Sequence, residues 1–340
     1  MSKQKLGMHG VLMGGAGSTG SSLLRTIINR HDDMFSGEEL SLFNKEQYFD
    51  CWDANKNKLL PGRWQRFPET RGWVPYRGSA LTHEDYCWEE NELKALIDQS
   101  ANLYEFSVRF FERPLLKYGK NIWVEKTPSN CYAFRLFLKS FPGGKVVHTT
   151  RNPYDSVASL VRRGMSPYFS AALWLYNTAS ALSVRDSAQY YLTRYENLVT
   201  EPLGEIESLC DFLGVGFFEH LLQPSGNDNQ DHSINPGWRA DRTASIKKQA
   251  ESTFSLLPEK DQILVKELLS CLRVSKKHAL KKEIPFCSCK EICDELDYEF
   301  FDLPVTQINH IRKDHIGEIF HRTFALKSTG IWDFPIELSF

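Results

Sequence analysis

The sequence lacks the features of several large classes of protein. No uninterrupted apolar stretch approaches the ~18 residues that would indicate a membrane-spanning helix. Neither sign of charge dominates, because 41 Lys and Arg residues stand against 43 Asp and Glu residues and leave a formal net charge of −2. General nucleic-acid and anionic-membrane binders are usually strongly basic, so we expect neither as a partner. No internal repeat or low-complexity tract stands out.

Targeting and disulfide signals are also scarce. The first residues are polar and basic, and glycines interrupt the apolar segment after Val11 before a signal-peptide core could form. We therefore expect a cytoplasmic protein whose eight cysteines are reduced and mostly buried. Cys287, Cys289 and Cys293 form one cluster, but their spacing lacks the paired C-x2-C halves of a zinc module. We interpret them as packing or surface thiols and expect no metal.

The composition is that of an ordinary folded protein, with 41% hydrophobic, 13% aromatic and 25% charged residues. The length of 340 residues exceeds the ~100–200 usual for one compact domain, although a single α/β core reaches 200–250 residues. We predict a catalytic domain over residues 1–270, with an insertion at 48–88, and an extension over 271–340 that packs on the core.

Short apolar runs alternate with longer helical patterns, as in a parallel sheet with crossover helices. Helical stretches are expected after a glycine-rich loop and after three prolines, since proline is tolerated at the first helical position. The predicted fold is therefore α/β, with a P-loop-like three-layer core of a central parallel sheet flanked by helices. The predicted strands are 10–13, 122–125, 145–150 and 190–195, and the prolines that open helices are Pro128, Pro153 and Pro202.

The segment 48–88 is rich in aromatic residues among prolines and glycines. It holds four of the eight tryptophans, namely Trp52, Trp64, Trp73 and Trp88, and four interspersed arginines, Arg63, Arg66, Arg71 and Arg77. Such an insertion is compatible with the wall of an acceptor pocket and equally with a small core that packs on the sheet. The arginines could select an anionic acceptor, or they could simply be solvated.

A glycine-rich loop follows the first predicted strand and precedes a helix. Glycines let the backbone approach a ligand closely, and the helix N-terminus behind them presents unpaired N–H groups with a partial positive charge. From Gly15 the pattern is G-x4-G followed by Ser21 and Ser22, which matches the G-x4-G-K-[ST] motif of nucleotide kinases and GTPases except for its lysine. The loop predicts a phosphate site, although glycine-rich turns also occur as purely structural connections.

A second candidate for binding phosphate begins at Arg151, directly after the strand predicted at 145–150. On the following helix Ser159 and Arg163 are four residues apart and share one face, so the three side chains could converge on one phosphate. Arginine offers bidentate contacts and serine a hydroxyl donor. The alternative is a surface arginine beside a helix N-terminus at Asn152.

Together these segments resemble the sulfotransferases that use 3′-phosphoadenosine-5′-phosphosulfate (PAPS), and the pattern is closest to tyrosylprotein sulfotransferases and their bacterial relatives. Residues 14–24 resemble the family's 5′-phosphosulfate loop and 151–163 its 3′-phosphate motif. Further matches follow in family order over residues 8 to 260. They are His31 with the segment 36–39, the run 125–128, the run 194–198, and the helix 202–214.

The resemblance implies that PAPS is the cosubstrate and that this chain's residues take the roles of the residues they match. Glu39 would be the base that accepts the hydroxyl proton, unless it is a surface glutamate at a helix start. Lys126 would stabilise charge on the leaving group, and Ser233 would assist the transition state. The implied cofactor-binding residues are Gly17, Ser18, Thr19, Gly20, Ser21, Ser22, Arg151, Ser159, Arg163, Tyr195, Arg239 and Lys247, although Tyr195 could instead be a core ring.

The phosphate loop departs from the family at one position. Relatives place Arg or Lys where this chain has Ser18, so Arg25 or Lys126 would have to supply the missing cation. Two alternatives to a sulfotransferase therefore stay open, a nucleotide-dependent kinase of the P-loop type and a catalytically silent sulfotransferase-like binding protein. The acceptor, a small molecule or a peptide with a hydroxyl or amine, is not identified by the sequence.

Overall fold

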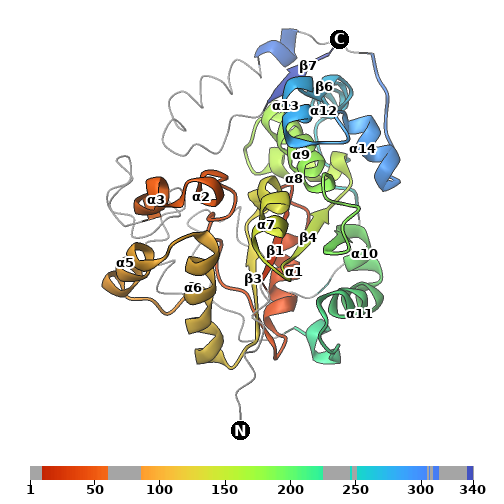
Figure 1. The fold of residues 1–340 in the computed structure, drawn as a ribbon. Coiled ribbons are helices and arrows are strands. Elements are labelled where there is room, and N and C mark those ends of the chain that lie inside the picture. Colours follow the sequence, from red (N-terminus) through yellow and green to blue (C-terminus); the bar gives the residue numbers. More distant parts are fainter. Residues whose placement is uncertain are drawn as a thin grey trace.

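The structure, a computed structural model, describes residues 10–59, 86–224, 246, 251–304, 306, 309–313 and 335–339. Within these residues, the main sheet has five parallel strands in the order β2-β3-β1-β4-β5. Figure 1 shows the three inner strands β3, β1 and β4 side by side. The strands are β1 (Gly10–Gly15), β2 (Met34–Phe35), β3 (Ile122–Lys126), β4 (Lys145–Thr150) and β5 (Tyr190–Arg194). The predicted α/β fold is confirmed. Strand β2 was not predicted, because two residues show no periodicity.

Prolines, polar caps and glycines set the limits of the helices along the sheet. Pro128, Pro153 and Pro202 each lie at the start of a helix, as predicted. Gly214 adopts a left-handed conformation and ends the last of these. The helices of this part are α1 (Ser21–Asn29), α5 (Glu90–Gln99), α6 (Leu103–Tyr118), η2 (Pro128–Ala133), α7 (Phe134–Ser140), α8 (Pro153–Arg162), α9 (Pro167–Leu182), α10 (Tyr195–Thr200), α11 (Pro202–Leu213) and η3 (Glu219–Leu222).

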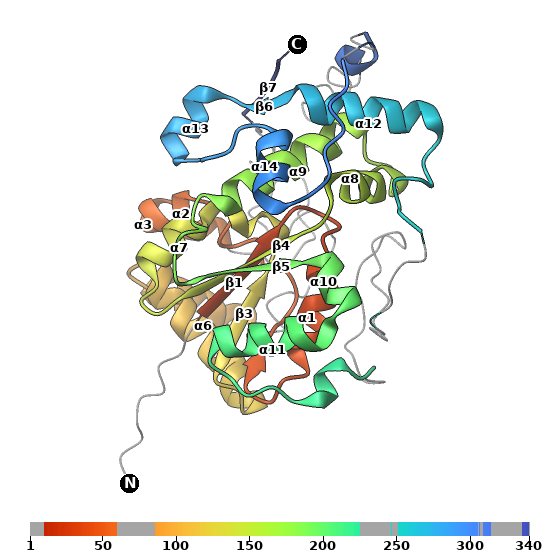
Figure 2. The same ribbon diagram turned by 90° about the vertical axis from the view of Figure 1, so that its right-hand side faces the viewer.

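The two faces of the sheet are covered by different helices (Figure 2). Side chains alternate along a strand, so Val11 and Met13 of β1 pack with α1 and α11. Leu12 points to the opposite face and joins a cluster with Phe111 of α6 and Phe137 of α7. The apolar residues of the inner strands β1, β3 and β4 are thus buried on both faces, as expected for a parallel sheet between two layers of helices, whereas the edge strand β5 is mostly half-buried.

The described part of the 48–88 insertion belongs to this second cluster. It comprises α2 (Gln47–Asp50), α3 (Trp52–Asn55) and η1 (Lys56–Leu59). Trp52 and Trp88 are buried, and their indole N–H groups donate to the carbonyls of Ser100, at 2.8 Å, and Phe110, at 2.9 Å. These two tryptophans therefore act as core residues. The other two tryptophans and the four arginines of the insertion lie outside the described residues.

The C-terminal part packs on the core through α9. Its described elements are α12 (Glu259–Cys271), β6 (Leu272–Val274), α13 (Lys276–Lys282), α14 (Cys289–Leu296) and β7 (Ile336–Leu338). Helix α12 spans the expected boundary at residue 270 and buries Val265 and Leu268 in one cluster with Trp174 of α9.

Cysteines of the C-terminal part contribute to the same apolar cluster. Cys289 and Cys293, one turn apart on α14, are buried with Cys271, and burial raises the pKa of the Cys293 thiol to about 12. In the part of the chain that the structure describes, no group of three His, Cys, Asp or Glu side chains is placed to hold a metal ion. Nor does any helix within the described ranges have the length and apolarity to cross a membrane.

Candidate functional site

Three of the predicted site segments meet because of the order of the strands. β1 lies between β3 and β4 in the sheet, and Met13 of β1 is in register with Lys126 while Gly15 is in register with Thr149. In a parallel sheet the carboxyl ends of all strands lie at one edge, where ligands usually bind. The glycine-rich loop after β1, Lys126 at the end of β3 and Arg151 after β4 therefore share this edge.

The loop turns sharply into α1. Ser18 has φ of 65° and Gly20 has φ of 82°, both in the left-handed region that favours glycine. Gly20 is also required for space, because a Cβ atom there would lie 2.7 Å from the ring of Tyr195. Gly20 is the N-cap of α1 and provides no side-chain cap, so the first N–H groups of the helix remain available to an anion.

Hydrogen bonds fix the loop to the elements around it. Thr19 Oγ1 donates to the carbonyl of Ala16 at 2.8 Å and lies 2.9 Å from Thr149 Oγ1 of β4. The hydroxyl of Ser156 on α8 donates to the carbonyl of Gly17 at 2.8 Å, and Asn177 on α9 donates to the carbonyl of Gly15 at 2.7 Å. The loop is thus preorganised by β4, α8 and α9. Asn177 carries no motif signal and could not be found from the sequence.

Arg151 lies against the same loop. Its side chain is only 6% exposed, and its guanidinium carbon lies 4.5 Å from the centre of the Tyr195 ring, on which Gly20 also packs. The guanidinium donates to Thr253 Oγ1 at 3.0 Å and lies 3.7 Å from the Asp155 carboxylate. The ring of Tyr195 therefore contacts both the phosphate loop and the cation of the second motif.

Ser159 and Arg163 follow on the outward side of α8. Ser159 is half-buried, and Arg163 is exposed at the C-cap of the helix. Asp155, one turn before Ser159, accepts hydrogen bonds from Ser252 Oγ at 2.6 Å and from the N–H of Phe254 at 2.9 Å. The spacing of four places Asp155, Ser159 and Arg163 along one side of the helix.

Lys126 links the loop to the predicted base. Its ammonium group donates to Ser22 Oγ at 3.3 Å and forms an ion pair with the Glu39 carboxylate. The side chains of Lys126 and Glu39 are 3% and 8% exposed, so this is a buried pair. Of the two cations that could replace the missing loop cation, Lys126 contacts the loop, whereas Arg25 binds the carbonyl of Gly37 at 2.9 Å and the Glu38 carboxylate at 3.0 Å.

Glu125 holds the segment that carries Glu39. Its Oε1 atom accepts the N–H of Leu40 at 2.9 Å and the hydroxyl of Thr127 at 2.7 Å, and Thr127 Oγ1 accepts the N–H of Ser41 at 3.1 Å. Glu125 is fully buried, and this burial raises its pKa. Glu125 begins the run 125–128, one of the segments that resemble the family, but it matches none of the roles that the resemblance implies. Its position next to Lys126 was the only signal that could have found it.

Three predicted site residues, Ser233, Arg239 and Lys247, lie outside the described residues.

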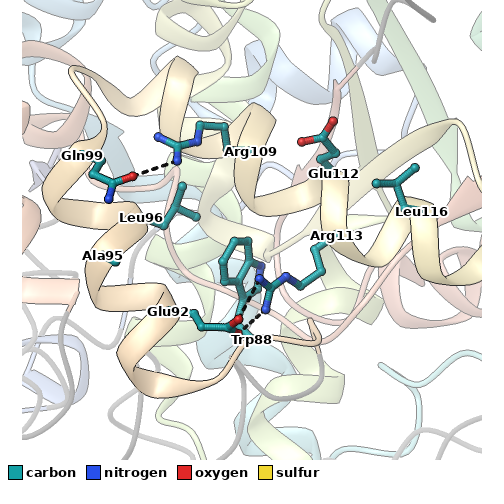
Figure 3. Close-up of a pocket in the computed structure, with 9 residues that line it drawn as sticks. All are labelled: Trp88, Glu92, Ala95, Leu96, Gln99, Arg109, Glu112, Arg113 and Leu116. Carbon is teal, nitrogen blue, oxygen red and sulfur yellow. Dashed lines mark hydrogen bonds and ion pairs between the residues drawn. The ribbon is translucent and has the colours of Figure 1, made fainter. Parts of the chain in front are cut away.

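A separate groove of about 490 Å³ lies between α5 and α6 above Trp88, and none of the predicted site residues lines it (Figure 3). The guanidinium of Arg113 stacks on Trp88, its carbon 3.8 Å from the ring centre, and forms an ion pair with Glu92. Arg109 donates to Gln99 at 3.1 Å. These contacts join the two helices across the groove.

Comparisons with known proteins match the part of the chain that holds this site. A family model described as "Sulfotransferase family" matches residues 10–219. Two curated omega-hydroxy-beta-dihydromenaquinone-9 sulfotransferases, from Mycobacterium bovis and Mycobacterium tuberculosis, are each 24% identical over 168 residues. The match covers 44% of this chain and 43% of each relative, so the chain spans less than half the length of these relatives.

A solved structure has the same fold over a longer stretch. The sulfotransferase domain from the curacin biosynthetic pathway is 20% identical and aligns over 88% of this chain and 100% of that domain, with a TM-score of 0.51.

Proposed function

Because the chain belongs to the sulfotransferase family, we propose that it transfers a sulfuryl group from PAPS to a hydroxyl or amine of an acceptor. The observation that supports this most directly is the meeting of the two anion-binding segments. Gly20 of the phosphate loop and the Arg151 guanidinium pack on the same Tyr195 ring. One molecule with two separate phosphate groups on an adenosine fits this arrangement.

The residues present suit each end of such a molecule. The N–H groups at the start of α1 and the hydroxyls of Ser21 and Ser22 would hold the phosphosulfate. Arg151, which is buried and always charged, would hold the 3′-phosphate together with Ser159 and Arg163. The ring of Tyr195 offers a flat surface for the nucleotide between them.

Lys126 and Glu39 would have different chemical roles, one neutralising charge and the other accepting a proton. PAPS would supply the sulfuryl group: the acceptor oxygen bonds to sulfur as the bond from sulfur to the bridging oxygen breaks, and the nucleotide leaves with negative charge on that oxygen. Lys126, already bonded to Ser22 of the loop, would neutralise this charge as a compact cation. Glu39 would accept the proton of the acceptor hydroxyl once Lys126 turns toward the bound anion. In the described structure the two side chains are paired, which keeps both charges compensated in a site excluded from water.

The acceptor is proposed only as a class. Sulfotransferases act on small-molecule acceptors, and the curated relatives are named for a hydroxylated dihydromenaquinone. Those relatives match this chain over less than half of their length, so we propose a small molecule with a free hydroxyl and leave a peptide as the second class to test.

Binding of the product nucleotide, 3′-phosphoadenosine-5′-phosphate (PAP), tests the cofactor site. We expect PAP to raise the melting temperature of the protein and Arg151→Ala to abolish this shift, because a buried charge-assisted contact is lost. Identical melting curves with and without PAP would contradict the proposal. A larger shift with ATP and Mg²⁺ would instead support a P-loop kinase.

Transfer itself is tested with labelled PAPS and a panel of hydroxyl, amine and peptide acceptors. Labelled product is expected, and Glu39→Ala should reduce turnover far more than it weakens PAP binding. If PAP binds but no acceptor is labelled, the protein is better described as a silent nucleotide-binding member of the family.

A further inference from the structure

We propose that Thr253 and Tyr298, which lie beyond residue 219 where the family match ends, are positioning residues for Arg151. The C-terminal part of the chain would thus complete the nucleotide site from outside the region that the family model matches. This inference rests on the proposed function, in which Arg151 binds the 3′-phosphate of the cosubstrate.

Thr253 acts on the side chain of Arg151. Its hydroxyl oxygen accepts a hydrogen bond from Arg151 Nη2 at 3.0 Å, and the threonine is only 5% exposed. The residues on either side dock on the first turn of α8, where Ser252 Oγ and the N–H of Phe254 both donate to Asp155. Asp155 in turn lies 3.7 Å from the guanidinium. The segment therefore directs the cation from one side.

Tyr298 acts on the backbone next to Arg151. Its hydroxyl donates to Glu196 Oε2 at 3.1 Å, and Glu196 Oε1 accepts the N–H of Asn152 at 2.8 Å. The ring of Tyr298 also lies under the guanidinium of Arg194, at 5.4 Å. A single carboxylate thus connects the end of α14 to the peptide group that follows Arg151. Burial and the nearby Glu196 carboxylate raise the pKa of Tyr298, which keeps its hydroxyl protonated as a donor.

Thr253 orders the guanidinium of Arg151, and Tyr298 orders the backbone next to it through Glu196. Together they limit the mobility of Arg151 at the position where it would bind the 3′-phosphate. An arginine loses a large rotamer entropy when it is immobilised, so a residue that orders it before binding improves affinity. The carbonyl of Arg151 is also fixed, by the indole N–H of Trp174 at 3.0 Å. With its backbone held by Trp174 and Glu196 and its guanidinium held by Thr253, Arg151 has little to reorganise when a phosphate arrives.

The test compares PAP affinity among hydroxyl-deletion variants of the whole chain. Thr253→Val removes the hydrogen bond to the Arg151 guanidinium, and Tyr298→Phe removes the hydrogen bond to Glu196, the carboxylate that accepts the Asn152 N–H. Each is expected to raise the Kd for PAP about 3- to 10-fold. Thr253→Ser keeps the hydroxyl and is expected to bind like the unchanged protein. Steady-state kinetics should show a raised KM for PAPS with little change in kcat and in the KM for the acceptor.

Matched controls separate positioning from general damage. Among the described residues the buried hydroxyl of Thr178 on α9 has no hydrogen-bond partner, so Thr178→Val makes the same substitution without touching Arg151. Tyr191 on β5 donates to Glu205 at 3.4 Å, and Tyr191→Phe removes a similar tyrosine–glutamate bond away from the site. Both controls are expected to leave the Kd for PAP unchanged when each protein is measured at the same interval below its melting temperature.

The outcomes distinguish this inference from the proposed function. If Arg151→Ala weakens PAP binding but Thr253→Val and Tyr298→Phe bind like the unchanged protein, the positioning role is refuted and the nucleotide site stands. If the two variants raise the KM for PAPS and for the acceptor alike, or the controls weaken PAP equally, the residues act only on overall stability and the inference is also refuted. If Arg151→Ala itself has no effect, the proposed 3′-phosphate site is wrong.

Discussion

The buried pair of Lys126 and Glu39 makes a quantitative prediction about stability. Replacing Lys126 by Met removes the cation that forms an ion pair with the Glu39 carboxylate, in a site where the two side chains are 3% and 8% exposed. Breaking a buried ion pair by removing one partner costs about 3–5 kcal/mol in the free energy of unfolding. Lys126→Met also removes the hydrogen bond to Ser22, at a cost of about 1 kcal/mol.

The double variant Lys126→Met with Glu39→Gln removes both charges and leaves neither uncompensated. It should therefore be less destabilised than the sum of the two single variants, by about 2–3 kcal/mol. Neither the single variants nor the double variant should transfer sulfate, because each lacks a proposed catalytic group. The double variant is thus expected to be more stable than the sum of the single effects predicts, but still inactive.

Urea unfolding followed by tryptophan fluorescence measures all four corners of this cycle. The pair of Lys56 and Asp53, in which the Asp53 side chain is 80% exposed, is the matched control, and Asp53→Asn should change the free energy of unfolding by less than about 1 kcal/mol. If the effects of Lys126→Met and Glu39→Gln simply add to within about 0.5 kcal/mol, the two groups are not coupled and the reasoning fails.

Three further changes are expected to have distinct effects. Ser18→Arg restores a loop cation and should lower the Kd for PAP about 5-fold, since a charged hydrogen bond exceeds a neutral one by about 1 kcal/mol; calorimetry showing equal affinity would mean that another cation already serves the loop. Glu125→Ala removes the acceptor of the Leu40 N–H beside the base, so kcat should fall more than PAP affinity, and unchanged turnover would exclude a positioning role. Burial lowers the pKa of His148 from 6.5 to about 3, so its stabilising contribution is complete above pH 6.5 and is lost as the pH falls toward 3. His148→Gln should flatten that decline in urea titrations at several pH values, and an unaltered slope would contradict the burial argument.

Local patterns were sufficient for the core of the fold. The apolar runs of four strands and the prolines at three helix starts report short-range preferences, and each was predicted close to its observed limits. The resemblance to sulfotransferases that was read from the ordered motifs is confirmed by the family match over residues 10–219. Strand β2 was not predicted, because two residues are too few to show hydrophobic periodicity, and it is defined by its pairing with β3.

The contacts within the candidate site could not be predicted without the order of strands in the sheet. The sequence could name Glu39 and Lys126 separately, but these residues are 87 positions apart, and their pairing follows from the segment after β2 lying on the end of β3. Likewise, the ring of Tyr195 joins Gly20 to Arg151 only because β5 pairs with β4 and β4 with β1.

The chemical groups of the site can be read from the amino-acid sequence, namely a glycine loop that exposes N–H groups and a set of cations and carboxylates in family order. Neighbouring residues in the sequence set the local backbone geometry of these groups, so their residue types and spacing are sufficient to recognise them. Which of these groups contact one another depends on tertiary packing, as for Glu125 with Leu40 and Thr253 with Arg151. Such contacts join residues that are distant in the sequence through strand order and helix packing, so the periodicity of a local segment cannot predict them.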